Sequence, residues 1–236
     1  MTRREGGRVT DAAEIRVLHG PGPELDRIYD EILRPSFDDD ELSPPGELAE
    51  GVAAGRITVL WRDDGAGTPL AAAVGTYDPG HRIMLLTWLA VRQGRRGSGL
   101  GGPLLDAAVA AWGAAFEPCL VLAEVADPER HDGSAAHGDP AARLRFYLRH
   151  GARVLELPYF QPAMGEGRRR VPDMLLVVLH ADPSFAGSAP DTVSGALLRT
   201  YLEEYQVAHE GAVGTDPQSA RLWQAVERPG GVPYRP

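Results

Sequence analysis

The sequence contains neither lysine nor asparagine, and all 24 of its basic residues are arginine. A single cysteine, Cys119, excludes an internal disulfide framework and fits a reducing compartment. The net charge of -9 argues against nucleic-acid binding, which requires a basic surface. No apolar run approaches the ~20 residues that span a bilayer, and residues 1–8 show no secretory signal. We therefore expect a cytoplasmic protein with no nucleic-acid partner and no membrane partner.

The composition is that of a globular protein, and its character changes near residue 181. The hydrophobic content of 43% and charged content of 24% are ordinary for a soluble domain of this length. We expect a disordered tail over residues 1–12 and one domain over residues 13–180. Residues 181–236 are expected to form a linker and a helical extension. The extension has three open roles: covering a substrate site, pairing two subunits in a homodimer, or packing on the sheet.

Hydrophobic periodicity predicts the elements of both parts. Strands are expected over residues 15–18, 57–61, 70–77, 82–91, 119–125, 153–157 and 173–179. Helices are expected over residues 23–33, 47–54, 101–115, 140–150, 193–209 and 217–227. Tight turns join the three strands between residues 57 and 91, so these strands are antiparallel. The continuous apolar run at 119–125 is typical of a central strand that is buried on both faces.

The most informative segment is a strand that ends at Val91, a turn rich in glycine and arginine, and a helix that begins at Gly101. Glycines let the backbone come close to a ligand, and the first turn of a helix leaves its N–H groups without partners. The positive end of the helix dipole adds to this attraction for anions. The segment therefore predicts a site for a phosphorylated cofactor.

One reading of this turn is a dinucleotide site. Gly97-x-Gly99-x-x-Gly102 satisfies the dinucleotide pattern, and Glu124 ends the next apolar strand, where a ribose-binding acid would lie. The match is weak because five residues separate Val91 from Gly97. A dinucleotide fold would also alternate strands and helices from its start, whereas three antiparallel strands precede this turn.

A second pattern in the same turn is more specific. Arg96-x-x-Gly99-x-Gly101 opens a helix after a strand, and about fifty residues later the pair Phe146-Tyr147 precedes a glycine and a new strand. On these two ordered motifs the chain resembles the GNAT (Gcn5-related N-acetyltransferase) superfamily over about residues 13–180. The resemblance implies an α/β (α+β) fold with a central mixed, mostly antiparallel twisted sheet flanked by helices. The C-terminal helical extension lies outside the resemblance.

The resemblance also implies acetyl-CoA as co-substrate and no metal. Backbone N–H groups of the turn would hold the pyrophosphate of coenzyme A, and main-chain groups at the end of the strand would polarise the thioester carbonyl. The implied cofactor-binding residues are Leu89, Ala90, Val91, Arg96, Gly97, Ser98, Gly99, Leu100, Gly101 and Gly102. Arg92 and Arg95 are interpreted as solvated surface charges.

Acetyl transfer to an amine needs a base for the ammonium and an acid for the departing thiolate. Tyr147 matches the superfamily tyrosine that acts as general acid, and the alternative is a core aromatic beside Phe146. Glu124 is the candidate general base, because a carboxylate among apolar neighbours has a raised pKa. Alternatives for Glu124 are an anchor for the substrate ammonium and a structural acid, and Asp127 has the same options.

The remaining residues with reactive side chains are predicted to have no part in catalysis. The loop at residues 131–139 contains histidine and aspartate without the spacing of a compact metal site, so we expect a solvated loop and a candidate substrate lid. Arg168-Arg169-Arg170 is interpreted as a solvated turn, and Cys119 as a core residue.

The resemblance implies direct transfer of an acetyl group to a primary amine of a small molecule or a peptide. Two alternatives stay open: a non-catalytic acyl-CoA sensor or partner-binding module of the same fold, and a transferase of a longer acyl group. One fold serves many acceptors, so the fold does not choose among them. The negative net charge and the acidic loop at residues 38–41 favour a cationic acceptor.

Overall fold

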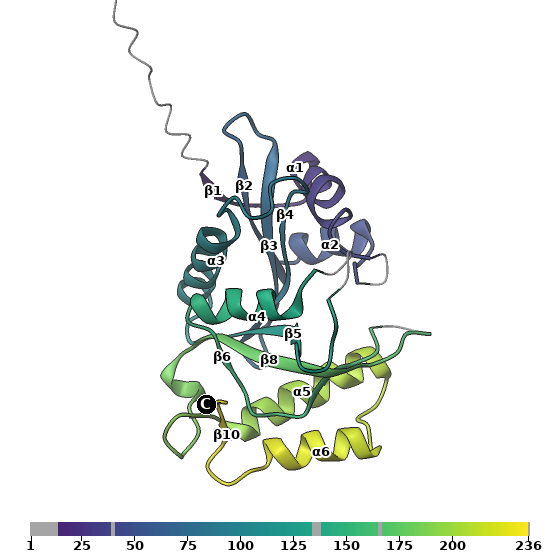
Figure 1. Ribbon diagram of the computed structural model, residues 1–236, viewed down its shortest axis with the longest axis vertical. Coiled ribbons are helices and arrows are strands. Elements are labelled where there is room, and N and C mark those ends of the chain that lie inside the picture. The colour runs from purple at the N-terminus through teal and green to yellow at the C-terminus, as the bar shows by residue number, and fades with distance from the viewer. Residues whose placement is uncertain (1–13, 39–40, 134–137, 165–166, 236) are drawn as a thin grey trace, which may run out of the picture.

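The computed structural model describes residues 14–38, 41–133, 138–164 and 167–235, so the tail expected over residues 1–12 lies outside the described residues. The centre is an eight-stranded sheet of order β1-β2-β3-β4-β5-β8-β6, with β7 paired to β8 (Figure 1). The strands are β1 Ile15–Val17, β2 Ile57–Asp63, β3 Pro69–Asp78, β4 Ile83–Val91, β5 Leu120–Ala126, β6 Arg153–Val154, β7 Tyr159–Gln161 and β8 Val171–Ala181. Among these strands β4 and β5 pair in parallel and the other neighbours pair antiparallel. The mixed, mostly antiparallel sheet predicted from the sequence is confirmed.

Helices flank both faces of the sheet. They are α1 Pro23–Ile28, which continues as the π-helix η1 Tyr29–Leu33, α2 Pro45–Ala53, α3 Gly101–Ala115, α4 Pro140–Arg149, α5 Gly195–Glu210 and α6 Pro217–Val226. Proline stands in the first turn of α1, α2, α4 and α6, where its missing N–H costs no hydrogen bond. The side chains of Asp139, Ser194 and Asp216 cap α4, α5 and α6 by accepting backbone N–H groups. The 3-10 turn η2 Pro183–Phe185 and a small sheet of β9 Thr192–Val193 and β10 Val232–Pro233 complete the chain.

Two features of the sheet differ from the predicted elements. Of the strand expected over residues 153–157, only Arg153 and Val154 form a ladder with β8. The N–H of Leu155 still donates to the carbonyl of Leu176 in β8, and Leu155 forms an isolated bridge to Tyr234 near the C-terminus. β7 has no counterpart among the predicted strands. Its three residues are too few to show an alternating pattern.

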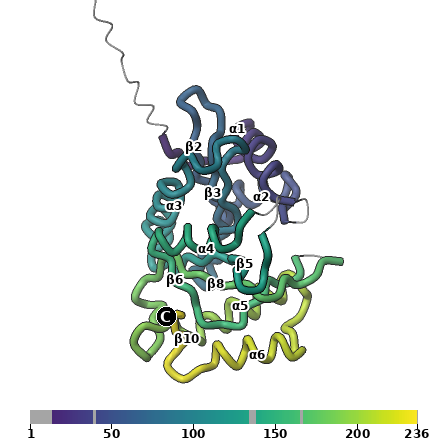
Figure 2. Tube along the Cα trace, viewed as in Figure 1, coloured from purple at the N-terminus to yellow at the C-terminus, as the bar shows by residue number. Residues whose placement is uncertain are grey.

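Alternate side chains of the central strands build the core on two faces. On one face, Met84 and Val121 pack in a cluster with α3 and α4. On the other face, Trp88 packs in a cluster with α1, η1 and α2. Leu85 and Leu122 lie on this second face in a further cluster with α5 and α6. Figure 2 shows α5 between the sheet and α6, so the extension adds two layers to this half of the sheet.

The C-terminal extension shares its hydrophobic core with the sheet. Leu122 and Leu176 of the sheet belong to one buried cluster with Leu198, Leu202 and Trp223 of the extension. Of the three roles left open by the sequence, packing on the sheet is therefore confirmed, while pairing in a homodimer stays a prediction. None of the described helices is long and apolar enough to cross a membrane.

Candidate active site

β4 and β5 separate halfway along their length. Their parallel pairing runs from Ile83 and Leu120 to Leu86 and Ala123 and ends there. The register of β3 against β4 shifts at the same level of β4. Beyond this point β4 continues to Val91 and β5 continues to its own end. The edges of β4 and β5 that face each other are therefore without a strand partner there, within the part of the chain that the structure describes.

Leu89, Ala90 and Val91 lie on the separated stretch of β4. On the edge of β4 that faces away from β5, these residues pair with alanines of β3. The side chains of Leu89 and Val91 pack toward α3 and α4, and that of Ala90 packs toward α1, η1 and α2. With their side chains engaged above and below the sheet, these residues present main-chain groups toward β5.

The turn between β4 and α3 presents its backbone to solvent. Gly97 and Gly99 have φ angles of 79° and 80°, in the left-handed region that favours glycine. The N-cap residue of α3, Leu100, makes no side-chain cap hydrogen bond, so the N–H groups of Gly101 and Gly102 open the helix without a side-chain acceptor. Such donors at the positive end of a 15-residue helix suit an anionic group.

Arg96 and Ser98 complete the predicted phosphate cradle. Arg96 is exposed and forms no ion pair with any described residue. Ser98 holds the shape of the turn, because its hydroxyl donates to the carbonyl of Arg95 at 2.5 Å and its N–H donates to the same carbonyl at 3.2 Å. The guanidinium of Arg96 is therefore the charge in this turn that is available to a ligand, together with the exposed Arg95.

Arg92 is not the solvated charge that we expected from the sequence. Its Nε donates to the carbonyl of Pro69 at 2.7 Å, and its guanidinium forms an ion pair with Glu31 of η1. The next side chain, Gln93, donates to the carbonyl of Pro35 at 2.6 Å. The planar fork of arginine can serve several acceptors at once. The start of the turn is thus fastened to η1 and to β3.

Tyr147 lies on α4 and is buried on the face of the sheet that carries α3. Burial raises the pKa of its hydroxyl to about 12. Its ring meets Phe146 edge-on, with 5.3 Å between ring centroids. At this pKa the phenol is protonated at neutral pH and has a proton to donate, and no described residue forms a hydrogen bond with its hydroxyl.

Glu124 is the first residue of β5 beyond the last pair with β4. Three neutral side chains donate to its carboxylate: Tyr159 at 2.5 Å, Gln161 at 2.8 Å and Tyr205 at 3.4 Å. Burial raises the pKa of Glu124 above its usual value, although these hydrogen bonds act in the opposite direction. No cation pairs with it among the described residues. This is the environment expected of a carboxylate that binds a proton more readily than an exposed one does.

The sequence did not indicate that Tyr205 contacts Glu124. The residue lies on α5, 81 positions after Glu124. Its only signal was a place on the apolar face of an amphipathic helix, together with Tyr201, on which its ring stacks at 5.7 Å. From the sequence, the segment of Tyr159 and Gln161 could line an acceptor pocket or form a packed loop; in the structure both side chains donate hydrogen bonds to Glu124.

Arg170 also departs from the expected solvated turn. It donates from Nε and from one terminal nitrogen to Glu210, at 2.7 and 2.6 Å, and from the other terminal nitrogen to Asp216 at 2.7 Å. Its guanidinium lies 4.4 Å from the centroid of the Phe160 ring. Arg170 therefore joins the hairpin of β7 and β8 to the end of α5 and the start of α6.

The remaining candidates have structural surroundings. Asp127 accepts the N–H of Glu129 at 3.0 Å and lies 3.4 Å from Arg235, contacts that fit the structural-acid alternative. Cys119 is fully buried, and burial raises its pKa to about 11, in keeping with the predicted core role. Residues 134–137 of the candidate lid lie outside the described residues.

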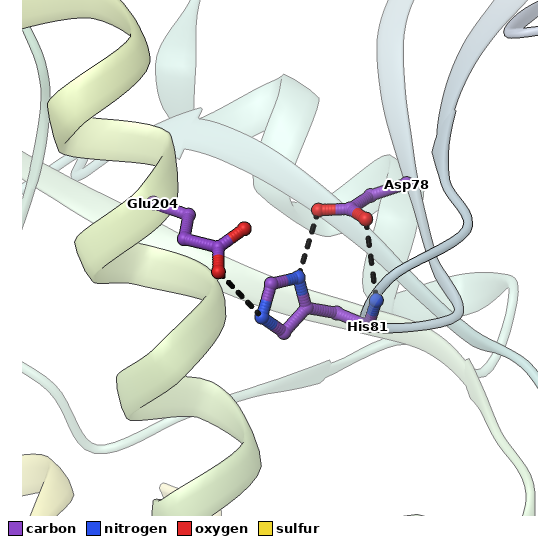
Figure 3. A group of neighbouring side chains, drawn as sticks. All are labelled: Asp78, His81 and Glu204. Atoms are coloured by element: carbon purple, nitrogen blue, oxygen red, sulfur yellow. Dashed lines mark hydrogen bonds and ion pairs between the residues drawn. The ribbon is translucent and has the colours of Figure 1, made fainter.

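A separate polar group lies where the turn between β3 and β4 meets α5. The ring of His81 lies between the carboxylates of Asp78 and Glu204 (Figure 3). Its Nδ1 is 2.9 Å from Asp78, and its Nε2 is 3.9 Å from Glu204. The ligand atoms of the three residues lie within 4.8 Å of one another, close enough to share a cation.

Comparison with solved structures places this arrangement in a known fold. A protein assigned to the GNAT acetyltransferases from Bacteroides thetaiotaomicron is 20% identical, with a TM-score of 0.51, over 74% of this chain and 88% of that chain. An acetyltransferase from Bacillus subtilis, solved with CoA, is 14% identical, with a TM-score of 0.47, over 72% of this chain and 99% of that chain. No protein-family model and no curated protein matches the sequence. On the first of these structures and on its own strand order, the chain has the fold of the GNAT superfamily.

Proposed function

We propose that this protein is an acyl-CoA-dependent N-acetyltransferase that transfers an acetyl group directly to a primary amine of a small molecule or a peptide. The observation that carries the proposal is the separation of β4 and β5 beyond Leu86 and Ala123. The glycine turn stands at the far end of the separated β4, and Glu124 stands at the point of separation on β5. A thioester lying between the strands would have phosphate donors at one end and a basic carboxylate at the other.

In this proposal the turn binds the pyrophosphate. The N–H groups from Gly97 to Gly102 and the guanidinium of Arg96 supply the donors and the positive charge. The unpaired main-chain groups of Leu89, Ala90 and Val91 orient the pantetheine arm and polarise the thioester carbonyl. Fixed donors of this kind stabilise the negative charge that develops on the carbonyl oxygen during attack.

Two side chains then move protons. Glu124 accepts a proton from the acceptor ammonium, directly or through a water, so that the free amine can attack the thioester carbon. The carbon–nitrogen bond forms, the carbon–sulfur bond breaks with its electron pair leaving on the thiolate, and the attacking nitrogen loses its second proton to water as the amide forms. Tyr147 donates its proton to the thiolate, because burial keeps its phenol protonated at the pH of the reaction.

The proposal is tested by thermal unfolding and by thiol release. Acetyl-CoA at 100 times its Kd stabilises a protein that binds it only when folded by about 2.7 kcal/mol, so the melting temperature should rise. A panel of primary amines, from small molecules to peptide N-termini, should then release free thiol with at least one member. An unchanged melting temperature at millimolar acetyl-CoA would contradict the proposal.

The same two measurements separate the alternatives. A non-catalytic acyl-CoA sensor would show the thermal shift and no thiol release with any amine. A transferase of a longer acyl group would release thiol faster from succinyl-CoA or a long-chain acyl-CoA than from acetyl-CoA. Desulfo-coenzyme A serves as the control, because it retains the pyrophosphate and has no thioester to transfer.

A further inference from the structure

The carboxylate of Glu124 is held from two directions. Tyr159 and Gln161 of β7 donate to Oε1 and Oε2, at 2.5 and 2.8 Å, from within the sheet. Tyr205 donates to Oε2 at 3.4 Å from α5, which belongs to the C-terminal extension and not to the sheet. A carboxylate offers about four acceptor positions, so three donors leave one position for a substrate proton.

Helix α5 is fastened on both sides of Tyr205. On the N-terminal side of Tyr205, the neighbouring Glu204 faces His81 (Figure 3). About one turn before Tyr205, the Tyr201 ring meets the His81 ring edge-on at 5.9 Å. Just over one turn after it, Glu210 forms a double hydrogen bond with Arg170. Anchors on either side of Tyr205 restrict rotation and sliding of the helix.

The second anchor connects directly to the segment that holds Glu124. Glu210 also accepts the N–H of Ala163 at 3.0 Å, two residues after Gln161. The hydroxyl of Tyr205 lies 3.7 Å from the sulfur of Met164 in the same segment. The donors of β7 and the donor of α5 are thus parts of one connected framework around one carboxylate.

We propose that helix α5 of the extension is part of the acceptor site, and that Tyr205 is a positioning residue that fixes Oε2 of Glu124 and directs its free acceptor position toward the amine. This inference rests on the proposed function for the identity of the amine site. It extends that function, because it assigns a role to a segment outside the part of the chain that resembles the superfamily. It implies that the extension is required for turnover as well as for stability.

The groups that face Glu124 are neutral, so removing the Tyr205 hydroxyl should shift the pKa of Glu124 in one direction only. They are the hydroxyls of Tyr159 and Tyr205 and the amide of Gln161, with the Tyr201 hydroxyl close enough to interact electrostatically. His209 lies one turn beyond Tyr205, and its ring meets the Tyr205 ring at 4.7 Å. Burial lowers the pKa of His209, so it is neutral at pH 7. Removing one donor to the carboxylate leaves its charged form less stable.

The test compares Tyr205→Phe with Tyr201→Phe. Both changes remove one hydroxyl from the same face of α5, but no described residue receives a hydrogen bond from Tyr201. In Tyr205→Phe we expect the acidic limb of kcat/KM to move up by about 0.5–1 pH unit, which lowers kcat/KM about 3- to 10-fold at any pH on that limb. Tyr201→Phe, which removes no hydrogen bond to the carboxylate, should move the limb less than Tyr205→Phe does. Identical pH profiles for Tyr205→Phe and the wild type would overturn the proposal.

A second readout does not depend on turnover. The side-chain carboxyl signal of Glu124 in 13C NMR, assigned by its loss in Glu124→Gln, should titrate at higher pH in Tyr205→Phe than in the wild type. Melting curves of both variants check that they fold. If the wild type releases no thiol with any amine, the proposed function fails, and the carboxyl titration alone decides whether Tyr205 positions Glu124.

Discussion

The imidazole of His150 lies directly against the backbone of Gly102. A Cβ atom on Gly102 would come within 2.7 Å of Cε1 and 2.8 Å of Nε2 of that ring. His150 ends α4, and its Nδ1 is held 2.7 Å from the carboxylate of Asp106 on α3. The last glycine of the turn motif is therefore needed for the close packing of α3 against α4, whether or not a phosphate binds there.

Gly102→Ala and Gly101→Ala form a matched pair. We expect Gly102→Ala to lower the free energy of unfolding by about 1–3 kcal/mol, because the His150 ring must move and an overpacked site does not relax freely. In Gly101→Ala the new Cβ would meet Val91 and Phe146 at 3.6 and 3.8 Å, which are ordinary contacts. Alanine is also the better helix former, so this variant should be neutral or stabilised by up to about 1 kcal/mol. Urea denaturation measures both, and equal losses would contradict the packing argument.

Gly99→Ala should weaken acetyl-CoA binding with little effect on stability. The φ of Gly99 is 80°, and an alanine pays about 1–2 kcal/mol in the left-handed region. The exposed turn can relax to avoid that cost, which displaces the N–H groups from the ligand. We expect at least a ~10-fold rise in the Kd for acetyl-CoA by calorimetry. Gly46→Ala, which would place its Cβ in open space, is the control and should bind acetyl-CoA like the wild type.

Tyr147→Phe should lower turnover without weakening the binding of acetyl-CoA. The substitution removes the proton donor and keeps the ring that packs against α3, so the fold should not change. General acid catalysis contributes about 10²–10⁴-fold, and the loss in kcat should fall in that range. Stopped-flow thiol release and calorimetric titration together measure the split. A variant with unchanged kcat would remove Tyr147 from the mechanism.

Glu124→Gln and Asp127→Asn separate a base from a structural acid on the same strand end. If Glu124 is the base, Glu124→Gln should lower kcat by about 10²-fold or more and leave the KM for the amine within a few-fold. If Glu124 anchors the substrate ammonium instead, KM should rise while kcat changes little. Asp127, capped by Glu129 and close to Arg235, should affect stability and not kcat. Steady-state kinetics with the best amine decides between these outcomes.

Arg170→Met should destabilise the protein in a pH-dependent way. The hydrogen bonds from Arg170 lower the pKa of Glu210 below its usual value of 4.5. A group with a lowered pKa stabilises the fold above its unfolded pKa and loses that contribution as the pH falls through its folded pKa. We expect a loss of about 3 kcal/mol at pH 7, which shrinks below about pH 4. Urea denaturation at pH 7 and at a pH below about 4 measures the loss, and Arg169→Met, at the exposed neighbouring position, is the control. A loss in Arg170→Met that is independent of pH would contradict the ion-pair explanation.

The sequence by itself determined the part of this protein that is encoded locally. Alternating apolar residues, prolines in the first turns of helices and the glycines of the turn after Val91 act over a few neighbouring residues, so most strands, the helices and the glycine turn before α3 could be predicted from them. The tertiary structure decided everything that depends on contacts across the chain. It placed Arg92 and Arg170 in ion pairs that join separate elements, reduced the strand expected at 153–157 to two residues, and brought Tyr205 to Glu124 across 81 positions. A hydrogen bond between distant segments leaves no periodicity in either segment, which is why only the folded chain could show that Tyr205 of the extension reaches Glu124.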